Sequence, residues 1–581
     1  MDYNKNYKEW LNKADSATKE QLLAISDNDN EIKECFSLPL AFGTAGMRGI
    51  IGAGTYRMNE YTVRRATKGL ADYILSIDKA DDGVVVAYDT RIFSYEFALA
   101  VARVLSYNKI KVFLYEDVRP VPMCSFAIRE TNAIAGVMIT ASHNPKEYNG
   151  YKVYGSDGAQ MSPDATDEIV NYIEKIEDYF SVKYADVIST ERSAVQGRGG
   201  IKLNNYITVI GETIDKKYFD IISKLSLSVE AIAAESKELK IVYTPIHGTG
   251  YKPVMRILKR MGLAIDVVQE QISPDGRFPT VTAPNPENAD TLKMGIELAE
   301  KINSEVVIGT DPDGDRMGIA LRGDDNNFYL LNGNQIGVLL LDYILTRHVE
   351  KGTLPANAAA IKTIVTTSLA KKVAENFGIA IYDVLTGFKY IGEKIKQWEI
   401  DGKHTFVFGY EESYGYLCGT HARDKDAVVA SMLFAEMVAY YKYIGTSVHQ
   451  RLQELFKKYG YYVDKNVAIT YKGLDGMQKM ATIMDTIRNI TIKDIAGYNV
   501  EFFSDYNTSI TTNSDGSTKK ILLPKSNVLY YGLEGGDWVC VRPSGTEPKL
   551  KVYVSISEKD REKTQKKADA IINYMIQEYM Q

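Results

Sequence analysis

Short apolar runs alternate with segments of helical character through most of the chain, and this alternation restricts its fold more than any other feature. In the first third, apolar runs at 84–87, 110–115 and 133–139 are separated by helical segments at 94–106 and 123–130. Short buried strands joined by helices predict a mainly parallel sheet with helices on its faces. The sequence therefore predicts an α/β fold.

The same alternation recurs twice further along, and the last part of the chain changes character. Apolar runs at 240–244 and 305–309, and later at 361–365, 379–385 and 405–408, predict two more α/β units. Beyond residue 461, strands and helices suit a smaller α+β domain. A chain of 581 residues suggests about four domains at roughly 150 residues each. We expect them at 1–206, 207–325, 326–455 and 456–581.

Composition excludes several classes of protein. The formal net charge is −6 and the basic residues are spread along the chain, which argues against a nucleic-acid partner. No signal-peptide pattern opens the chain and no apolar run reaches about 18 residues, so we expect a cytoplasmic protein with no membrane partner. The scattered cysteines predict buried thiols rather than disulfides or a zinc site: Cys35, Cys124, Cys418 and Cys540.

A polar segment follows the apolar run at 133–139. It reads Thr-Ala-Ser-His-Asn-Pro-Lys-Glu-Tyr-Asn-Gly-Tyr-Lys over 140–152. Ser142 is thus expected just beyond the carboxyl end of a strand, where open α/β sheets bind ligands. Pro145 and the Asn149-Gly150 pair predict a fixed loop that presents a hydroxyl, an imidazole and lysines. The alternative interpretation is an ordinary polar turn.

Three further polar loops extend this pattern. The Asp311, Asp313 and Asp315 carboxylates alternate along residues 309–316, so an extended loop points them to one side, as a hard cation requires. An EF-hand is excluded because glycine and glutamate are missing at its sixth and twelfth positions. Residues 409–415, with Glu411 and Ser413, suit hydroxyl recognition, whereas residues 542–549 suit a phosphate. The alternative interpretation of each of these three loops, taken alone, is a solvated loop or surface turn.

Together with Gly-Thr-Ala-Gly-Met-Arg-Gly at 43–49, these ordered motifs resemble the α-D-phosphohexomutase superfamily from about residue 42 to 553. The resemblance implies three related α/β domains with mixed sheets plus a C-terminal α+β domain. The Glu-Glu-Ser motif at 411–413 resembles the corresponding motif of the phosphoglucomutase branch, which also contains phosphopentomutases. It implies interconversion of α-D-glucose 1-phosphate and glucose 6-phosphate, through a phosphoserine enzyme and a glucose 1,6-bisphosphate intermediate.

The resemblance also implies roles for individual residues. Ser142 is the phosphate carrier, and the proton acceptor is Lys152, His143 or Arg48, with Lys152 or a neighbour favoured. Mg²⁺ is held by Ser142, Asp311, Asp313 and Asp315. The phosphorylated sugar substrate is contacted by a set of polar residues in the third and fourth domains: Lys389, Glu411, Ser413, Arg423, Arg542, Ser544, Gly545 and Thr546.

Several alternatives stay open. Within the superfamily, phosphopentomutase, phosphomannomutase and glucose 1,6-bisphosphate synthase use the same loops. A non-catalytic sugar-phosphate-binding protein is expected to have lost Ser142 or an aspartate, and both are present. A metal-dependent phosphatase is distinguished by release of inorganic phosphate. The sequence leaves the preferred sugar and the oligomeric state undetermined.

Overall fold

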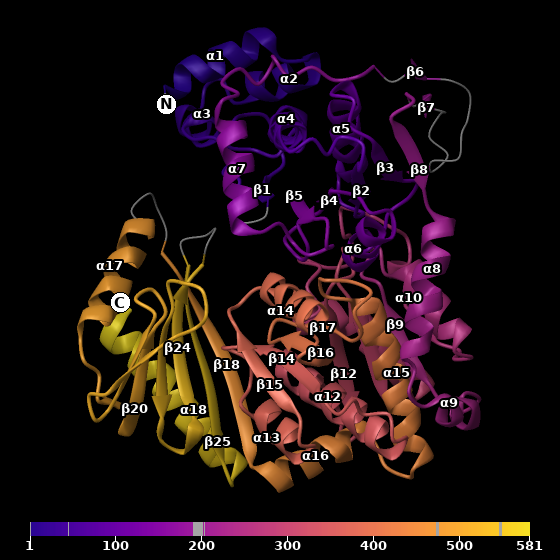
Figure 1. Ribbon diagram of the computed structural model, residues 1–581, viewed down its shortest axis with the longest axis vertical. Coiled ribbons are helices and arrows are strands. Elements are labelled where there is room, and N and C mark those ends of the chain that lie inside the picture. The colour runs from indigo at the N-terminus through magenta and orange to yellow at the C-terminus, as the bar shows by residue number, and fades with distance from the viewer. Residues whose placement is uncertain are drawn as a thin grey trace. The chain divides into compact units, whose positions relative to one another are not determined.

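The computed structural model describes residues 2–43, 46–186, 188–189, 201–202, 204–471, 476–544 and 549–580. The chain divides into two compact units, whose helices and strands are labelled in Figure 1. The first unit comprises Met1–Leu330, Gly392–Gln397 and Gly415–Ala439, and the second comprises Leu331–Ile391, Trp398–Tyr414 and Tyr440–Gln581. Each unit is described by itself.

The first sheet of unit 1 has the strand order β1-β5-β4-β2-β3-β8. Its last four strands in that order are parallel, whereas β5 runs antiparallel to β4 and β1 antiparallel to β5. The sheet is therefore mixed. The strands are β1 (Gly46–Ile50), β2 (Val84–Tyr88), β3 (Val112–Tyr115), β4 (Ala135–Ile139), β5 (Tyr148–Gly155) and β8 (Ile207–Ile210), with a separate short pair, β6 (Ile188–Ser189) and β7 (Ile201–Lys202).

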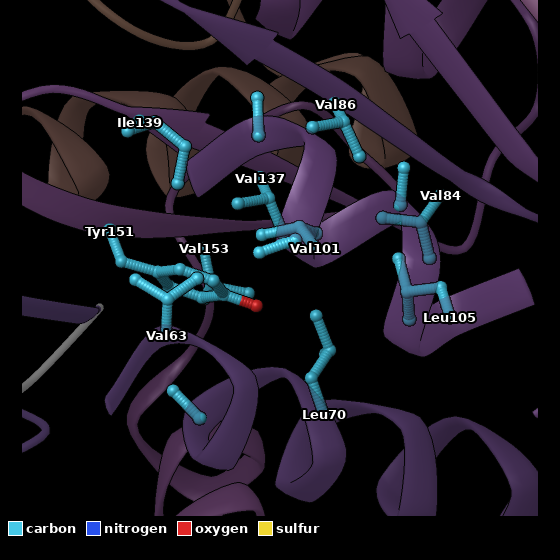
Figure 2. Packing of buried hydrophobic residues seen from close by; sticks show 14 of the residues in the cluster. Val63, Leu70, Val84, Val86, Val101, Leu105, Val137, Ile139, Tyr151 and Val153 are labelled. Carbon is cyan, nitrogen blue, oxygen red and sulfur yellow. The ribbon is translucent and has the colours of Figure 1, made fainter. Parts of the chain in front are cut away.

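Helices cover both faces of this sheet because its strands are apolar on both sides. Val84 and Val86 pack with α4 (Glu60–Ser76), α5 (Ser94–Tyr107) and α7 (Pro163–Glu174), as Figure 2 shows in part. Val85 and Ala87, one residue out of phase, pack with α6 (Val121–Glu130) on the opposite face. Three N-terminal helices form a separate aromatic cluster around Trp10: α1 (Tyr3–Lys13), α2 (Ser16–Ala24) and α3 (Asp29–Phe36).

A second sheet in unit 1 has the order β10-β9-β11-β12-β13. Strands β9, β10 and β11 are parallel, and β12 returns antiparallel to β11. The strands are β9 (Ile241–Thr244), β10 (Asp266–Val267), β11 (Val306–Thr310), β12 (Met317–Arg322) and β13 (Phe328–Leu331). The helices are α8 (Glu212–Ile222), α9 (Val229–Glu235), α10 (Tyr251–Arg260) and α11 (Ala289–Ile302), with 3₁₀ turns at Ser223–Leu225 and Gln269–Gln271.

Unit 2 contains a parallel set of strands and a large antiparallel sheet. The parallel set is β14 (Ala358–Thr363) between β15 (Ala380–Val384) and β16 (Thr405–Glu411). Its helices are α12 (Gly333–Glu350), α13 (Leu369–Asn376) and α16 (Val448–Tyr459). Two helices, α14 (Phe388–Asp401) and α15 (Ala427–Tyr443), have residues in both units. Strand β17 (Gly415–Leu417) belongs to unit 1.

The antiparallel sheet runs β18-β25-β24-β23-β20-β21-β22, with β19 paired to β20 (Figure 1, orange and yellow). Helices α17 (Gly476–Asn489) and α18 (Arg561–Tyr579) pack on its apolar face. This is the α+β arrangement expected for the end of the chain. The strands are β18 (Tyr461–Thr470), β19 (Asp494–Ile495), β20 (Tyr498–Asp505), β21 (Ile510–Asn513), β22 (Thr518–Lys520), β23 (Leu529–Leu533), β24 (Trp538–Pro543) and β25 (Lys549–Glu558), with a 3₁₀ turn at Glu534–Gly536.

The turn predicted at Asn149-Gly150 is wrong, because both residues lie inside β5. The Asn149 amide donates to the Ile92 carbonyl and to Ser94 Oγ, so a residue typical of turns is satisfied within a buried strand. Gly150 is required by crowding, since a Cβ there would lie 2.5 Å from the Thr140 carbonyl oxygen. Lys152 consequently projects from a strand rather than from a loop.

Two other expectations from the sequence concern the cysteine thiols and the absence of membrane-spanning helices. All four cysteines are buried and free, which confirms the prediction of buried thiols. In the described parts of the chain, no single helix has the length and apolar character needed to cross a membrane. The pair α15 and α16 meets that test only when the two are taken together, across an 85° bend.

Helix α4 has both a buried and an exposed leucine, which allows its packing against the first sheet of unit 1 to be tested. Leu70 is fully buried against the sheet, whereas Leu75 on the same helix is 43% exposed. We expect Leu70→Ala to lower the free energy of unfolding by about 2–5 kcal/mol, because the substitution leaves a cavity. Leu75→Ala should change the free energy by less than about 0.5 kcal/mol. Urea unfolding followed by circular dichroism measures both, and equal losses would contradict the packing described.

Candidate active site

Ser142 lies in a tight turn directly after β4, at the carboxyl end of that strand. The side chain is buried, and the backbone adopts a left-handed conformation with φ of 53°. This conformation costs a residue other than glycine about 1–3 kcal/mol, so the surroundings must hold it in place. One such contact is the Ser142 amide, which donates to Thr140 Oγ1 at 2.8 Å.

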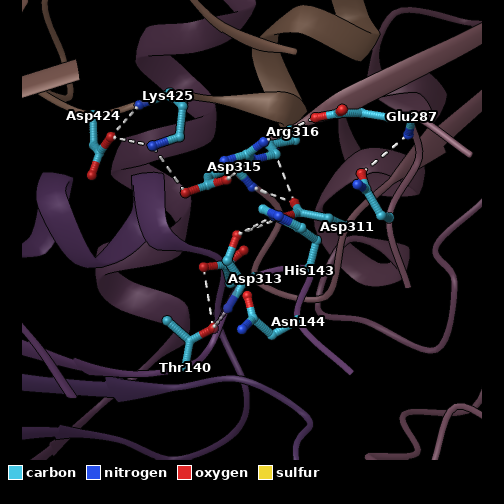
Figure 3. A network of polar contacts seen from close by, with 12 residues as sticks. Thr140, His143, Asn144, Glu287, Asp311, Asp313, Asp315, Arg316, Asp424 and Lys425 are labelled. Atoms are coloured by element: carbon cyan, nitrogen blue, oxygen red, sulfur yellow. Dashed lines mark hydrogen bonds and ion pairs between the residues drawn. The ribbon is translucent and has the colours of Figure 1, made fainter. Parts of the chain in front are cut away.

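The three predicted aspartates lie in the turn between β11 and β12. One carboxylate oxygen from each of Asp311, Asp313 and Asp315 lies within 4.8 Å of the others, and all three side chains are buried. Asp311 Oδ1 accepts hydrogen bonds from the backbone amides of Asp315 and Arg316, at 3.1 and 2.9 Å. The turn is thereby closed on itself with its carboxylates gathered (Figure 3).

The serine turn and the aspartate turn contact each other, although about 170 residues separate them in sequence. Ser142 Oγ donates to Asp311 Oδ2 at 3.1 Å, and Thr140 Oγ1 donates to Asp313 Oδ2 at 3.1 Å. A backbone hydrogen bond from the Val121 amide to the Asp313 carbonyl, at 2.8 Å, also ties the aspartate turn to the start of α6. The predicted nucleophile and the predicted metal ligands therefore share one site.

Two lysines neutralise this buried negative charge. Lys152 Nζ lies 2.8 Å from Asp313 Oδ2 and 3.5 Å from Asp315 Oδ2. Lys425 Nζ lies 3.2 Å from Asp315 Oδ2 and 3.0 Å from Asp424 Oδ1, as Figure 3 shows. Both lysine side chains are largely buried, so their charges act in a poorly screened environment.

Burial and these charges shift the pKa values of the acidic cluster in opposite directions. Burial, together with the charges of Asp313 and Asp315, holds the pKa of Asp311 well above its usual range. Burial acts in the same sense on Asp313, but the nearby Lys152 ammonium outweighs it, and the pKa of Asp313 is lowered. The negative charge of the cluster is therefore unevenly distributed over its carboxylates.

Two of the three candidate proton acceptors, Lys152 and His143, differ in protonation. Burial alone would lower the pKa of Lys152, but the Asp313 and Asp315 carboxylates outweigh it, and the pKa is raised. Burial, reinforced by the charges of Arg316 and Arg48, holds the pKa of His143 well below its usual value. Near neutral pH, Lys152 is thus a cation and His143 a neutral imidazole.

His143 and Arg48 both lie beside the serine turn. His143 Nδ1 is 3.3 Å from Ser142 Oγ, and Arg48 Nη1 donates to Asn144 Oδ1 at 3.0 Å. Arg48 reaches this position because β1 is paired with β5, in register Arg48 to Gly150. The structure therefore brings together all four residues predicted from sequence to carry the chemistry: Ser142, His143, Lys152 and Arg48.

Arg423 is placed differently from the other predicted substrate contacts. It lies in unit 1 and is buried, and Nη1 donates to the carbonyls of Thr420 and Ala422, at 2.6 and 3.2 Å. Its neighbour His421 is also buried and lies 2.7 Å from Asp426 Oδ2, so it is a packed core histidine and not a surface one. The role of Arg423 in substrate binding remains a prediction.

The remaining predicted substrate contacts lie in unit 2. Glu411 ends β16 and Ser413 follows it, whereas Lys389 is in the first turn of α14, with Nζ 5.0 Å from the Tyr390 ring. Arg542 lies near the end of β24, and the Ser544 amide donates to the Lys549 carbonyl at 2.7 Å. Gly545 and Thr546 lie outside the described residues.

Sequence reasoning missed several charged residues around the serine turn. Asp89 and Arg91 directly follow β2, so the rule that ligands bind at carboxyl ends of parallel strands, which identified Ser142, points to them as well. Lys425 contacts an aspartate far away in sequence. No local pattern marks it, because its role depends on the path of the chain after β17.

Comparisons with known proteins match this chain in each of its four expected domains. Models of "Phosphoglucomutase/phosphomannomutase" match in four parts: alpha/beta/alpha domain I at 39–180, domain II at 216–324, domain III at 332–459 and the C-terminal domain at 513–572. The expectation of three α/β domains with mixed sheets and a different C-terminal domain is confirmed.

Curated relatives cover nearly the full chain. A phosphoglucomutase of Staphylococcus epidermidis (strain RP62A) is 37% identical over 534 residues, which is 92% of this chain and 93% of the relative. A phosphoglucomutase of Staphylococcus aureus (strain MRSA252) is 35% identical over 565 residues, which is 97% of this chain and 98% of the relative.

Solved structures show a similar fold at lower identity. A putative phosphomannomutase from Thermus thermophilus has a TM-score of 0.66 at 22% identity, covering 93% of this chain and 99% of its own. The Paramecium phosphoprotein parafusin, described as a phosphoglucomutase, has a TM-score of 0.64 at 18% identity, covering 92% of this chain and 93% of its own.

Glu412, next to the predicted substrate contact Glu411, is expected to make the stability of unit 2 depend on pH. Burial, together with the charge of Glu411, raises the pKa of Glu412 from 4.5 to about 7. Between these values the folded state keeps a proton that the unfolded state has released, so stability falls as pH rises from about 4.5 to 7. The slope is at most about 1.4 kcal/mol per pH unit.

We expect Glu412→Gln to flatten this dependence, and Glu534→Gln, an exposed substitution in the same unit, to leave it unchanged. Urea midpoints at pH 5 and pH 7.5 measure the effect. A residual slope is expected from Asp464, whose pKa is raised to about 6 by burial. An identical slope in wild type and Glu412→Gln would contradict the assignment.

Proposed function

The chain belongs to the phosphoglucomutase/phosphomannomutase family of the α-D-phosphohexomutase superfamily, and from this premise we propose that it interconverts α-D-glucose 1-phosphate and glucose 6-phosphate. The observation that carries the proposal is the 3.1 Å contact of Ser142 Oγ with Asp311, inside a buried carboxylate cluster flanked by two lysines. The names of the staphylococcal relatives support glucose as the sugar.

Ser142 is proposed to carry the phosphoryl group. Its bond to phosphorus breaks as a hydroxyl of the sugar phosphate attacks, which gives glucose 1,6-bisphosphate and a free serine. The bisphosphate then turns over in the site, and its other phosphoryl group returns to Ser142. One residue is thus donor and acceptor in turn. The fixed backbone of the turn supports this role, because a transferring group must be held in line with its acceptor.

Proton transfer is proposed to involve His143 and Lys152 in different capacities. The attacking hydroxyl must lose a proton, and a neutral imidazole accepts one more readily than a lysine held protonated by two carboxylates. His143 lies 3.3 Å from Ser142 Oγ, and Lys152 is paired to Asp313 at 2.8 Å. This pairing favours His143 as acceptor and Lys152 as the cation that offsets charge on the phosphoryl group, the reverse of the preference expected from sequence.

We propose that Ser142, Asp311, Asp313 and Asp315 hold Mg²⁺. The donor set is all oxygen, as this ion prefers. Among the described residues, Asp313 Oδ1 and Asp315 Oδ1 are buried without a hydrogen-bond partner, and burial with like charges raises the pKa of Asp311. A bound cation relieves both costs. When bound, Mg²⁺ stabilises negative charge on the serine oxygen as it leaves phosphorus.

Sugar recognition is assigned to the residues of unit 2. Glu411, Ser413 and Lys389 are proposed to contact sugar hydroxyls, and a site built for hydroxyls rejects an epimer that leaves them unpaired. Arg542 and Ser544, with Gly545 and Thr546, are proposed to grip the phosphate that does not react. Arg423 of unit 1 is retained as a weaker candidate because its Nη1 donates to backbone carbonyls.

The alternatives of phosphopentomutase and phosphomannomutase keep the same serine chemistry and change only the sugar. The family name includes phosphomannomutases, so the choice of sugar is decided by assay. A non-catalytic sugar-phosphate-binding protein is disfavoured, since the serine and all three aspartates are present and in contact.

The first test compares wild type and Ser142→Ala on the 1-phosphates of glucose, mannose, ribose and glucosamine, with Mg²⁺ and a trace of glucose 1,6-bisphosphate. We expect kcat/KM to be highest for glucose 1-phosphate, and Ser142→Ala to abolish turnover while folding normally, since the phosphate carrier is lost. Preference for ribose or mannose would change the sugar assignment. Turnover by Ser142→Ala at the wild-type rate would refute the phosphoserine mechanism.

Removal of the metal gives a second prediction. We expect chelation by EDTA to lower kcat at least roughly 100-fold, because the leaving serine oxygen loses its neutralising charge, and added Mg²⁺ to restore it. Asp313→Asn should weaken Mg²⁺ binding measured by calorimetry, whereas Asp266→Asn, an exposed carboxylate in the same unit, should not. Equal Mg²⁺ affinity in wild type and Asp313→Asn would exclude this site.

A further inference from the structure

Arg91 lies in the loop after β2, and its guanidinium is directed at the backbone of the serine turn. The side chain is completely buried. Nη1 donates to the carbonyls of Pro145 and Tyr148, at 2.9 and 3.0 Å. Nη2 donates to the carbonyls of Ser142, at 2.6 Å, and Asn144. One side chain thus binds four carbonyls of a single short segment, 142–148.

Arg91 is itself held rigidly on the other side. Asp89 Oδ2 lies 3.4 Å from Arg91 Nε, and the Arg91 amide donates to Asp89 Oδ1 at 2.9 Å. The Phe278 ring covers the guanidinium, with its centroid 5.1 Å from Cζ. The backbone of Arg91 also pairs with Gly276, where a Cβ would approach the Ile92 nitrogen to 2.3 Å. The Arg91 guanidinium is therefore held in place by contacts on both sides.

We infer that Arg91 is a positioning residue, which holds Ser142 in its left-handed conformation and thereby keeps Ser142 Oγ directed at Asp311. The inference rests on the proposed function and names a residue on which that function depends. Strained backbone at a functional site persists only where its surroundings determine it. The Ser142 carbonyl is fixed by Arg91 and the Ser142 amide by Thr140, so both peptide groups flanking the strained residue are held.

Arginine is specifically suited to this role. Its planar guanidinium presents five donors in a fixed fork, whereas lysine presents its three donors at one atom. A lysine at position 91 keeps the positive charge beside Asp89 but cannot reach four carbonyls spread over segment 142–148. Arg91→Lys therefore separates the effect of the fork from the effect of the charge.

The test combines hydrogen exchange with kinetics, using Arg91→Lys and a matched control, Arg103→Lys. Arg103 is a partly buried arginine of α5 that donates to the Ala185 carbonyl at 2.8 Å, away from the serine turn. We expect Arg91→Lys to increase amide exchange within 142–148 by at least about tenfold, and kcat to fall about 100-fold with KM for the sugar phosphate within about twofold. Arg103→Lys should change none of these.

Chemical rescue gives a further measurement. In Arg91→Ala, millimolar guanidinium ion is expected to restore part of kcat, since it refills the fork, whereas methylammonium should not. Unchanged exchange over 142–148 in Arg91→Lys, or a rise in KM without a fall in kcat, would overturn the inference. Hydrogen exchange does not depend on turnover, so a wild-type protein without mutase activity would refute the proposed function and leave this inference to be judged by exchange alone.

Discussion

Three carboxylates buried within 4.8 Å of one another are the constraint on which the rest of unit 1 depends. Burying one unpaired charge is expensive, and burying three that repel each other is more so unless cations and hydrogen bonds offset the cost. Here Lys152 and Lys425 supply part of that compensation from segments far apart in sequence, and backbone amides of the aspartate turn itself supply another part. The fold of unit 1 brings these compensating groups together.

Two sheets meet at this point through the carboxyl ends of their strands. The serine turn follows β4 of one sheet and the aspartate turn follows β11 of the other. A hydrogen bond from Thr140 joins the two turns, and one from Val121 joins the aspartate turn to α6, a helix on the first sheet. Close approach makes this contact feasible: a Cβ at Gly314 of the aspartate turn would lie 2.7 Å from Cβ of Pro120, the residue before α6.

Much of this was predictable from sequence because the relevant signals are local. Apolar alternation located the parallel strands, and the spacing of Asp311, Asp313 and Asp315 indicated a convergent acidic turn. What sequence could not give was pairing between distant segments. Strand β5 was mistaken for a loop because Asn149 and Gly150 are typical of turns, whereas tertiary contacts decided their conformation. Arg91 and Lys425 were missed for the same reason, since each acts on a segment far away in sequence.

The central claim is that Ser142 passes a phosphoryl group to and from a sugar, and label transfer tests it most directly. Purified protein is treated with glucose 1,6-bisphosphate carrying ³²P, washed, digested and mapped by mass spectrometry, and a second portion is chased with unlabelled glucose 1-phosphate. The account predicts label on Ser142 alone and its quantitative transfer to sugar phosphate during the chase. Label on another residue, or its release as inorganic phosphate, would contradict the account.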